Sequence, residues 1–298
     1  MIIGAGFTGL IAAYVFPQDA IREAAPGPAQ MHQALLRFRS DEISKLTGIP
    51  FKQVTVRKGI WLAGKFVQPS IGVANMYSQK CLGRVLGDRS IWNLETVQRF
   101  IAPPTFYAQL IDTVGHRIDW NTRVDFNVAK TCGRPFINTS PLPLVLTSLG
   151  IMTPDVMFER EPISVVKFTV SRCEAYQTVY FPSMLHSMYR ASITGNTLIC
   201  EFADKPEGDW EADLLNAFQL HGDLEQQEMT KQPFGKIAPI DNAIRKRMIH
   251  KLSAEHNIYS LGRFAVWRNI LLDDMLQDAT IVKRLLHANE YDLQIAAL

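Results

Sequence analysis

The sequence predicts an α/β fold, and three features of the chain support this expectation. A short apolar strand at the beginning runs into Gly-x-Gly-x-x-Gly and a helix. Four segments in the middle alternate apolar and polar residues, which is typical of an antiparallel sheet. The last third combines helices with one short buried strand. We therefore expect a domain with a parallel sheet, discontinuous in sequence, and an inserted α+β domain that contains the antiparallel sheet.

The first ten residues, MIIGAGFTGL, form the most informative motif of the chain. Gly4 allows a tight turn after the strand, Gly6 lets the backbone approach a pyrophosphate, and Gly9 lets the helix pack close to the strand. The amides at the start of the helix favour anionic phosphates. Glu23 follows 19 residues after Gly4, where a carboxylate can accept hydrogen bonds from ribose hydroxyls. The motif therefore predicts a dinucleotide site on a Rossmann-like unit.

The elements of the first half follow from apolar periodicity and from breaker residues. After a helix over 7–16 and a strand over 20–24, the Pro and Gly residues of 25–28 indicate a loop. Ser40 caps a helix that ends before Gly48. Further along we expect a hairpin over 51–67, a helical region beginning at 90–95, a helix over 105–114, a strand over 118–126 and a short buried strand over 135–141.

The second half mixes sheet and helix patterns. Gly195-Asn196 is expected to form a tight turn between two strands of the antiparallel sheet. We expect strands over 163–170, 178–181, 187–193, 197–202 and 257–262, and helices over 210–220, 241–253 and 271–287.

Composition excludes several classes of protein. The chain has 298 residues, of which 47% are hydrophobic and 20% charged, as is ordinary for a globular protein. A net charge of +2 gives no general attraction to polyanions, and no apolar run reaches the ~20 residues that span a bilayer. The four cysteines are far apart, so neither a metal site nor a disulfide framework is expected. Because the N-terminal segment lacks the basic region of a signal peptide, we expect a cytoplasmic location.

Four landmarks, in order along the chain, resemble one flavoprotein superfamily. Besides the N-terminal motif they are Arg123-Val124, FINTSPLP at 136–143, and YSLGRFAVW at 259–267, which Asp273 and Asp274 follow. They resemble the branch that contains monoamine oxidases, protoporphyrinogen oxidase and UDP-galactopyranose mutase. The resemblance implies FAD as the cofactor, with NAD alone as the alternative. It divides the chain into an FAD-binding domain over 1–48, 98–150 and 232–298 and a substrate domain over 49–97 and 151–231.

The resemblance also assigns the residues that would hold FAD. The family has a Gly-Gly-Arg stretch after the ribose acid, whereas 25–32 reads APGPAQMH here. Arg37 or Arg39 would then reach the phosphates, and we select Arg39. The other assigned residues are Gly4, Gly6, Phe7, Thr8 and Gly9 for the pyrophosphate, Glu23 for the adenosine ribose, Val124 for adenine, Thr139 in the mid-chain turn, Gly262 and Arg263 for the phosphates or ribityl chain, and Asn269 to Asp273 for the pyrimidine end of the flavin.

Four residues are candidates for catalysis. His32, in the loop after the second strand, is either a proton carrier or a loop histidine held by backbone groups. His186 and Tyr189 are expected on strands of the substrate domain, where a structural role is the alternative for both. Arg190 could fork onto a carboxylate or phosphate, or belong to a solvated face of the sheet.

The leading interpretation is an FAD-dependent, amine-oxidase-like oxidoreductase that transfers hydride from a carbon bearing an amine to flavin N5. A non-redox sugar-nucleotide mutase is one alternative. A second alternative rests on the segment HQALLRFRS at 32–40, which resembles small bacteriophage flavoproteins linked to thymine hypermodification. That resemblance implies an amino-modified thymine base as the substrate, host cytoplasm as the location, and DNA as a partner. Arg245-Lys246-Arg247 would contact its phosphates or form a solvated helix face.

Overall fold

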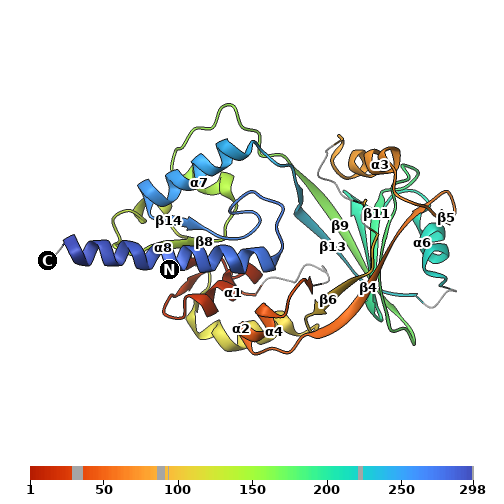
Figure 1. Cartoon of the computed structure of the whole chain (residues 1–298), viewed down its shortest axis with the longest axis horizontal. Coiled ribbons are helices and arrows are strands. Elements are labelled where there is room, and N and C mark those ends of the chain that lie inside the picture. The colour runs from red at the N-terminus through yellow and green to blue at the C-terminus, as the bar shows by residue number, and fades with distance from the viewer. Residues whose placement is uncertain (29–35, 86–90, 93, 221–223, 297–298) are drawn as a thin grey trace.

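The computed structural model describes residues 1–28, 36–85, 91–92, 94–220 and 224–296. Two sheets dominate it, a small parallel one and a large mixed one (Figure 1). Both termini lie on the side of the parallel sheet. No helix among the described residues is both long enough and apolar enough to cross a membrane.

The parallel sheet has five short strands. Its spatial order is β14-β8-β1-β2-β7, which is 5-4-1-2-3 when only these strands are counted along the chain, as in a Rossmann sheet. β1 is central, because Ile2 pairs with Ile21 on one side and with Ile137 on the other. The strands are β1 (Ile2–Ile3), β2 (Ile21–Arg22), β7 (Ile118–Asp119), β8 (Phe136–Asn138) and β14 (Ile258–Ser260).

Helices cover both faces of the parallel sheet, and each of its five strands begins with a buried apolar residue. Ile2 and Ile137 face the core shared by α1, α4 and α8, whereas Ile3 and Phe136 face the core shared by α5 and α7. The predicted Rossmann-like unit is therefore confirmed. The helices are α1 (Phe7–Val15), α2 (Glu42–Thr47), α4 (Phe106–Val114), α5 (Leu142–Ser148), α7 (Asn242–His256) and α8 (Leu272–Ala296), with short 3₁₀ turns at Gly115–Arg117 and Phe126–Val128.

The large sheet has the order β13-β9-β12-β11-β10-β4-β6-β3, with β5 paired to β4. Most neighbours are antiparallel, as predicted, but β10 and β4 run parallel. The turn at Gly195, with φ +63, joins β11 to β12 as expected. The strands are β3 (Arg37–Phe38), β4 (Lys52–Leu62), β5 (Lys65–Phe66), β6 (Val97–Ile101), β9 (Arg160–Val170), β10 (Ala175–Tyr180), β11 (Met188–Gly195), β12 (Thr197–Ala203) and β13 (Leu224–Ile237).

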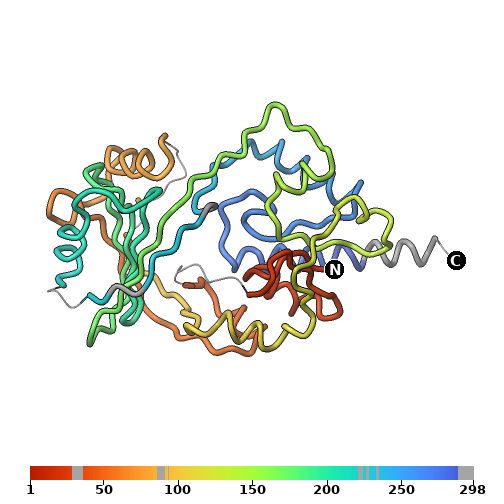
Figure 2. Tube along the Cα trace, turned by 180° about the vertical axis from the view of Figure 1, so that it is seen from behind, coloured from red at the N-terminus to blue at the C-terminus, as the bar shows by residue number. Residues whose placement is uncertain are grey.

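The two long strands β9 and β13 extend from the large sheet toward the parallel one, as the chain trace in Figure 2 also shows. Ile237 at the end of β13 belongs to the core beneath α7, whereas Val166 in β9 belongs to the core beneath α6 (Trp210–Phe218). Three segments that were expected in the FAD-binding domain, 37–38, 98–101 and 232–237, lie in strands of the large sheet. The division into domains itself stays a prediction.

Several elements differ from expectation: α5 and β13 were not predicted, β7 is shorter than the strand expected over 118–126, and three further differences lie between residues 51 and 95. The segment over 51–67 does not turn near its middle. β4 continues to Leu62, and the chain turns at Ala63-Gly64 into the two-residue strand β5. The described residues of 90–95 form no helix, since the chain leads into β6, which pairs with β4 through five residues. The helix α3 (Ile71–Leu82) was not predicted, although the Ser70 hydroxyl caps it by accepting from the Val73 amide.

A buried lysine fastens α3 to the large sheet. Lys80 donates from Nζ to the backbone oxygens of Phe181 (2.9 Å), Ser183 (2.5 Å) and Met188 (2.5 Å). These oxygens line the loop between β10 and β11. Burial lowers the pKa of Lys80 to about 7. The position of this loop therefore depends on an ammonium group that has little access to water.

We expect the stability of the parent protein, relative to Lys80→Met, to rise between pH 7 and pH 10.5. The folded state releases the Lys80 proton near pH 7, whereas the unfolded chain holds it up to the ordinary value of 10.5. The unfolded state thus binds more protons in this window, and the free energy of unfolding rises by at most about 1.4 kcal/mol per pH unit. Urea unfolding at several pH values measures it, with the exposed Lys246→Met as control. A constant difference between parent and Lys80→Met would contradict it.

Candidate functional site

The glycines of the N-terminal motif fix the contact between β1, α1 and β8. Gly4 has φ +99, and a Cβ there would overlap Thr139 Oγ1. A Cβ on Gly9 would overlap the carbonyl oxygen of Gly4. Thr139 completes the contact, because its amide and hydroxyl both donate to the Ile3 oxygen, at 3.0 and 2.7 Å. The motif is therefore packed so closely that side chains at Gly4 and Gly9 are excluded.

Gly6 differs from its two neighbours. Its backbone, with φ −72 and ψ 178, is open to any residue, and a Cβ would meet nothing within 4 Å. Neither strain nor packing within the protein requires glycine here. Gly6 is also the N-cap of α1, so the first amides of the helix lie beside it without intrahelical acceptors. The open space therefore lies where an anion would meet the helix N-terminus.

Glu23 is held at the carboxyl end of β2. Its carboxylate accepts from the amides of Ala5 (2.7 Å) and Ala25 (2.9 Å), one on each oxygen. Each oxygen keeps a lone pair for a further donor, such as a hydroxyl. The Thr122 amide donates to the Glu23 carbonyl at 2.8 Å, so the segment that carries Val124 passes close by. Val124 is half-buried against the core beneath α7.

The last strand of the parallel sheet also ends at this edge. Gly262, with φ +87, follows Leu261, the first residue after β14. A Cβ on Gly262 would lie 2.6 Å from Thr8 Cγ2. The carboxyl ends of β1, β2, β8 and β14 thus meet around the start of α1. We call this group the nucleotide cradle; it consists of Gly4, Gly6, Phe7, Thr8, Gly9, Glu23, Thr139 and Gly262.

Arg263 connects the cradle to the large sheet. Its guanidinium donates to Asn269 Oδ1 at 3.1 Å and to the Gly235 oxygen at 3.4 Å. Gly235 lies in β13. Asn269 therefore orients the guanidinium group of Arg263, so these two predicted residues are in direct contact.

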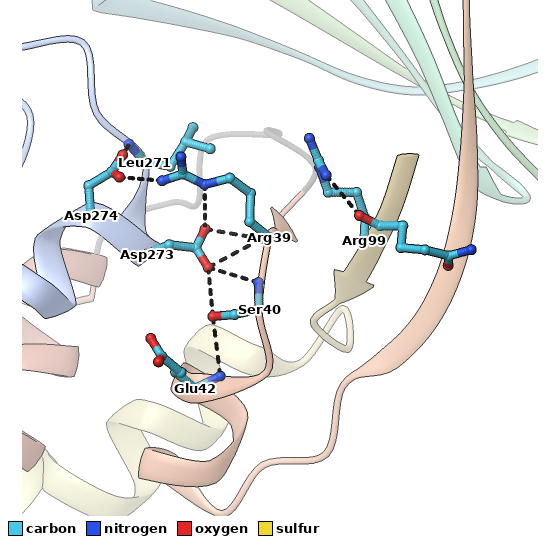
Figure 3. A network of polar contacts seen from close by, with 8 residues as sticks. Arg39, Ser40, Glu42, Arg99, Leu271, Asp273 and Asp274 are labelled. Atoms are coloured by element: carbon cyan, nitrogen blue, oxygen red, sulfur yellow. Dashed lines mark hydrogen bonds and ion pairs between the residues drawn. The ribbon is translucent and has the colours of Figure 1, made fainter. Parts of the chain in front are cut away.

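Asp273 and Asp274 at the start of α8 hold the segment that carries Arg39 (Figure 3). The buried Asp273 carboxylate accepts from the amides of Arg39 (3.2 Å) and Ser40 (3.3 Å), and the Arg39 guanidinium pairs with Asp274. Burial would raise the pKa of Asp274, but the Leu271 amide and Arg39 outweigh it and lower that pKa. The structure thus places Arg39 and Asp273 in direct contact, through the Arg39 amide and the Asp273 carboxylate. Their contacts with a cofactor stay predictions.

A second cluster lies on the face of the large sheet that turns away from α6. Arg190 pairs with Glu201 through Nε and through Nη2, the latter at 2.7 Å. Tyr189 donates to Glu201 Oε1 at 3.1 Å, and Lys236 Nζ lies 4.2 Å from the centroid of the Tyr189 ring. Arg37 reaches the same face and donates to the Thr178 and Thr194 hydroxyls, each at 2.7 Å. We call this group the polar face; it consists of Arg37, Thr178, Tyr189, Arg190, Thr194, Glu201 and Lys236.

The charged groups of the polar face shift one another's pKa values. Burial would raise the pKa of Glu201, but Arg190, with help from Lys236, outweighs burial and lowers it. Burial raises the pKa of Tyr189 well above its ordinary value. Burial, with the nearby charge of Arg190, lowers the pKa of Arg37 to about 10. At neutral pH the face therefore carries three cations around one ionised carboxylate.

His186 is not part of either group. Its Nε2 lies 3.1 Å from Asp213 Oδ2 on α6, and its ring packs against Phe181. In Figure 1, α6 covers the side of the large sheet that faces away from the parallel sheet. Burial, followed by the charge of Lys80, lowers the pKa of His186. The structure thus separates His186 from the cradle by the thickness of the sheet, and its catalytic role stays untested. His32 lies outside the described residues.

Several contributions to these groups were missed in the sequence, including those of Glu201, Thr178 and Thr194. Lys236 lies in β13, which was not predicted as a strand. Arg37 was considered only as a residue that would contact the phosphates of FAD. Tyr107 on α4 donates from its hydroxyl to the Ala5 oxygen at 3.1 Å, inside the motif itself. No local signal marks any of them, because their partners are distant in the sequence. Within the described ranges, no group of three or more His, Cys, Asp or Glu side chains is placed to hold a metal ion.

Comparisons with known proteins identify the fold. No family model and no curated protein matches the sequence. Among solved structures, reduced UDP-galactopyranose mutase matches with a TM-score of 0.67 at 14% identity, covering 96% of this chain and 93% of that chain. A fatty acid isomerase from P. acnes that produces CLA matches with 0.59 at 11%, covering 95% and 97%. The rebeccamycin biosynthetic enzyme RebC with reduced flavin matches with 0.51 at 12%, covering 89% and 55%.

These likenesses cover nearly the whole chain but share few residues. They show that the chain has the fold of these enzymes, a Rossmann-like unit joined to a large mixed sheet, as predicted. None of the matched structures named here bears on the expected link to modified thymine.

We expect Glu201→Gln to lower the free energy of unfolding by about 3 kcal/mol at pH 7, because it leaves Arg190 and Lys236 without their carboxylate. The stabilisation by Glu201 is present above its ordinary pKa of 4.5 and is lost as the pH falls through the lowered value in the folded state. In Glu201→Gln, the free energy of unfolding should therefore no longer show the decrease at low pH that the Glu201 carboxylate causes. Urea unfolding of parent and variant between pH 3 and 7 measures both effects. Equal stability of the two proteins at pH 7 would contradict the expectation.

Proposed function

We propose that the protein is an FAD-dependent enzyme whose nucleotide cradle binds the pyrophosphate and adenosine of FAD. The observation that carries this proposal is Gly6, where glycine is required by nothing inside the protein and a Cβ would enter open space at a helix N-terminus. A dinucleotide whose pyrophosphate approaches the backbone explains it. The solved structure of RebC with reduced flavin, which has the same fold, supports flavin over a nicotinamide cofactor.

The residues of the cradle fit such a cofactor. The amides at the start of α1 would meet the pyrophosphate, and Glu23 keeps lone pairs for the ribose hydroxyls. Thr122, two residues before Val124, donates to the Glu23 backbone, so we expect Val124 near the adenine that would follow the ribose. When bound, the flavin supplies the redox chemistry, and the protein supplies orientation, electrostatics and exclusion of water.

For the reaction, we propose oxidation of a carbon that bears an amine, with hydride passing to flavin N5. The feature that favours an amine is Glu201, a buried carboxylate kept ionised beside the Tyr189 hydroxyl. A neutral amine could donate a hydrogen bond to this carboxylate, whereas the excess of cations on the polar face would not attract an ammonium group. Arg190 orients Glu201 by its two-point contact and restrains it from turning.

A sugar-nucleotide mutase is the second candidate, because the mutase structure matches with a TM-score of 0.67. The diphosphate of such a substrate would need cations on the polar face. Arg190 is already engaged by Glu201, whereas Lys236 faces the Tyr189 ring and Arg37 is held by threonine hydroxyls. Anaerobic bleaching of the flavin by amines, but not by nucleotide sugars, would favour the oxidase over the mutase. The action on thymine in DNA remains a third, untested proposal.

We expect Gly6→Ala to lower the affinity for FAD by about tenfold or more, a loss of about 1.4 kcal/mol or more. The new methyl group occupies the space that the pyrophosphate needs. Because that space is open in the protein itself, the free energy of unfolding should change by less than about 1 kcal/mol. Visible absorption of the purified protein titrated with FAD measures the affinity, and urea unfolding measures the stability.

Gly72→Ala is the matched control, since Gly72 also lies in the first turn of a helix and its Cβ would have room. It should leave FAD affinity unchanged. If Gly6→Ala binds FAD as tightly as the parent, the cradle does not hold a pyrophosphate. If the parent neither contains nor binds FAD, the proposed function is wrong.

A further inference from the structure

A pocket of about 600 Å³ opens at the edge of the large sheet, outside the nucleotide cradle. β6 pairs with β4 only up to Val56, so the later part of the β4 edge is left to other elements. The turn into β5 and the segment around Trp92 close this space. The side chains that matter for its chemistry are Arg57, Phe66, Trp92, Glu95 and Gln177.

Two aromatic rings line the pocket and stay open to solvent. Phe66 is 51% exposed and Trp92 is 45% exposed, which is unusual for such large apolar side chains. The Phe66 ring has a fixed place, because it lies over Gly59, where a Cβ would come within 2.7 Å of it. It also packs edge-to-face with Trp61 at 5.1 Å. The pocket therefore offers a preformed apolar surface on which a flat ring can pack.

The lining contains charged residues of both signs. Arg57 and Lys58 are cations, and Glu95 is a carboxylate. Burial and the charge of Arg99 lower the pKa of Lys58, and Glu95 opposes them. A bound anion would meet the Arg57 guanidinium, whereas Lys58, the next residue of β4, points to the other face of the sheet. The amide side chain of Gln177 adds a hydrogen-bonding group to the wall.

We propose that this pocket binds a planar aromatic ring that carries an anionic group. The ring packs against Phe66 and Trp92, and the anion pairs with Arg57, whose partner in the neighbouring strand is Gln177. The volume lies within the range of pockets that hold small molecules. The inference does not rest on the proposed flavin chemistry, because no lining residue belongs to the nucleotide cradle.

The test is isothermal titration calorimetry with 1-naphthyl phosphate, which combines a flat ring with an anion. The protein is first saturated with FAD, so that the phosphate does not enter the cradle. We expect a Kd of about 1 mM or tighter, in keeping with a ligand of this size. The uncharged 1-naphthol and inorganic phosphate should each bind at least about tenfold more weakly. The first lacks the anionic group and the second lacks the aromatic ring.

Variants then locate the site. Phe66→Leu and Trp92→Leu keep apolar bulk but remove the rings, and Arg57→Gln removes a cation; each should weaken binding by about three- to tenfold. Arg247→Gln, an exposed arginine on α7, should leave binding unchanged. The proposal is overturned if 1-naphthyl phosphate shows no saturable binding, if 1-naphthol binds equally well, or if the three variants bind like the parent.

The flavin site and the aromatic pocket can be disproved separately. Gly6→Ala should bind FAD more weakly but, with the cradle saturated at a higher FAD concentration, bind 1-naphthyl phosphate like the parent. Trp92→Leu should bind 1-naphthyl phosphate more weakly but FAD like the parent. A protein that binds 1-naphthyl phosphate and no FAD would support the pocket and refute only the flavoenzyme.

Discussion

The contact of α1 with the end of β1 is the constraint on which the rest of the structure depends. β1 has only two residues and pairs on both sides, so the turn at Gly4 and the helix after it fix its direction. The Gly4 oxygen lies against Gly9, and Thr139 closes the opposite side. Because three strands and one helix meet here with no room for a side chain, the carboxyl ends of the sheet converge on a single point.

The second constraint is the path of β13 between the two sheets. Its register with β9 shifts between Gln232 and Lys236, just before the strand enters the core beneath α7. A Cβ on Gly235 would overlap Ile163, and the Gly235 oxygen faces the Arg263 guanidinium. The same few residues thus place Lys236 on the polar face and connect that face to the turn after β14. The geometry between cradle and polar face is therefore set by backbone packing more than by charge.

What the sequence could predict was governed by local backbone rules. The spacing of Gly4, Gly6 and Gly9 predicts a strand, a turn and a helix, because each glycine acts within a few residues of the others. Turns such as Gly195-Asn196 are predictable for the same reason. The single long strand β4 was not, because its length depends on pairing with β10, which lies far along the chain. The pairing of Arg39 with Asp274, and of Arg190 with Glu201, likewise depends on how distant segments meet.

In the proposed function, the choice of reaction depends on the side chains of the polar face, since the fold is shared with a mutase, an isomerase and RebC. A polyanionic substrate would have to compete with Glu201 for Arg190, in a place where burial strengthens the existing pair. A neutral amine could donate to the Glu201 carboxylate without displacing Arg190. The cost of rearranging buried charges therefore favours a substrate that adds to the network over one that breaks it.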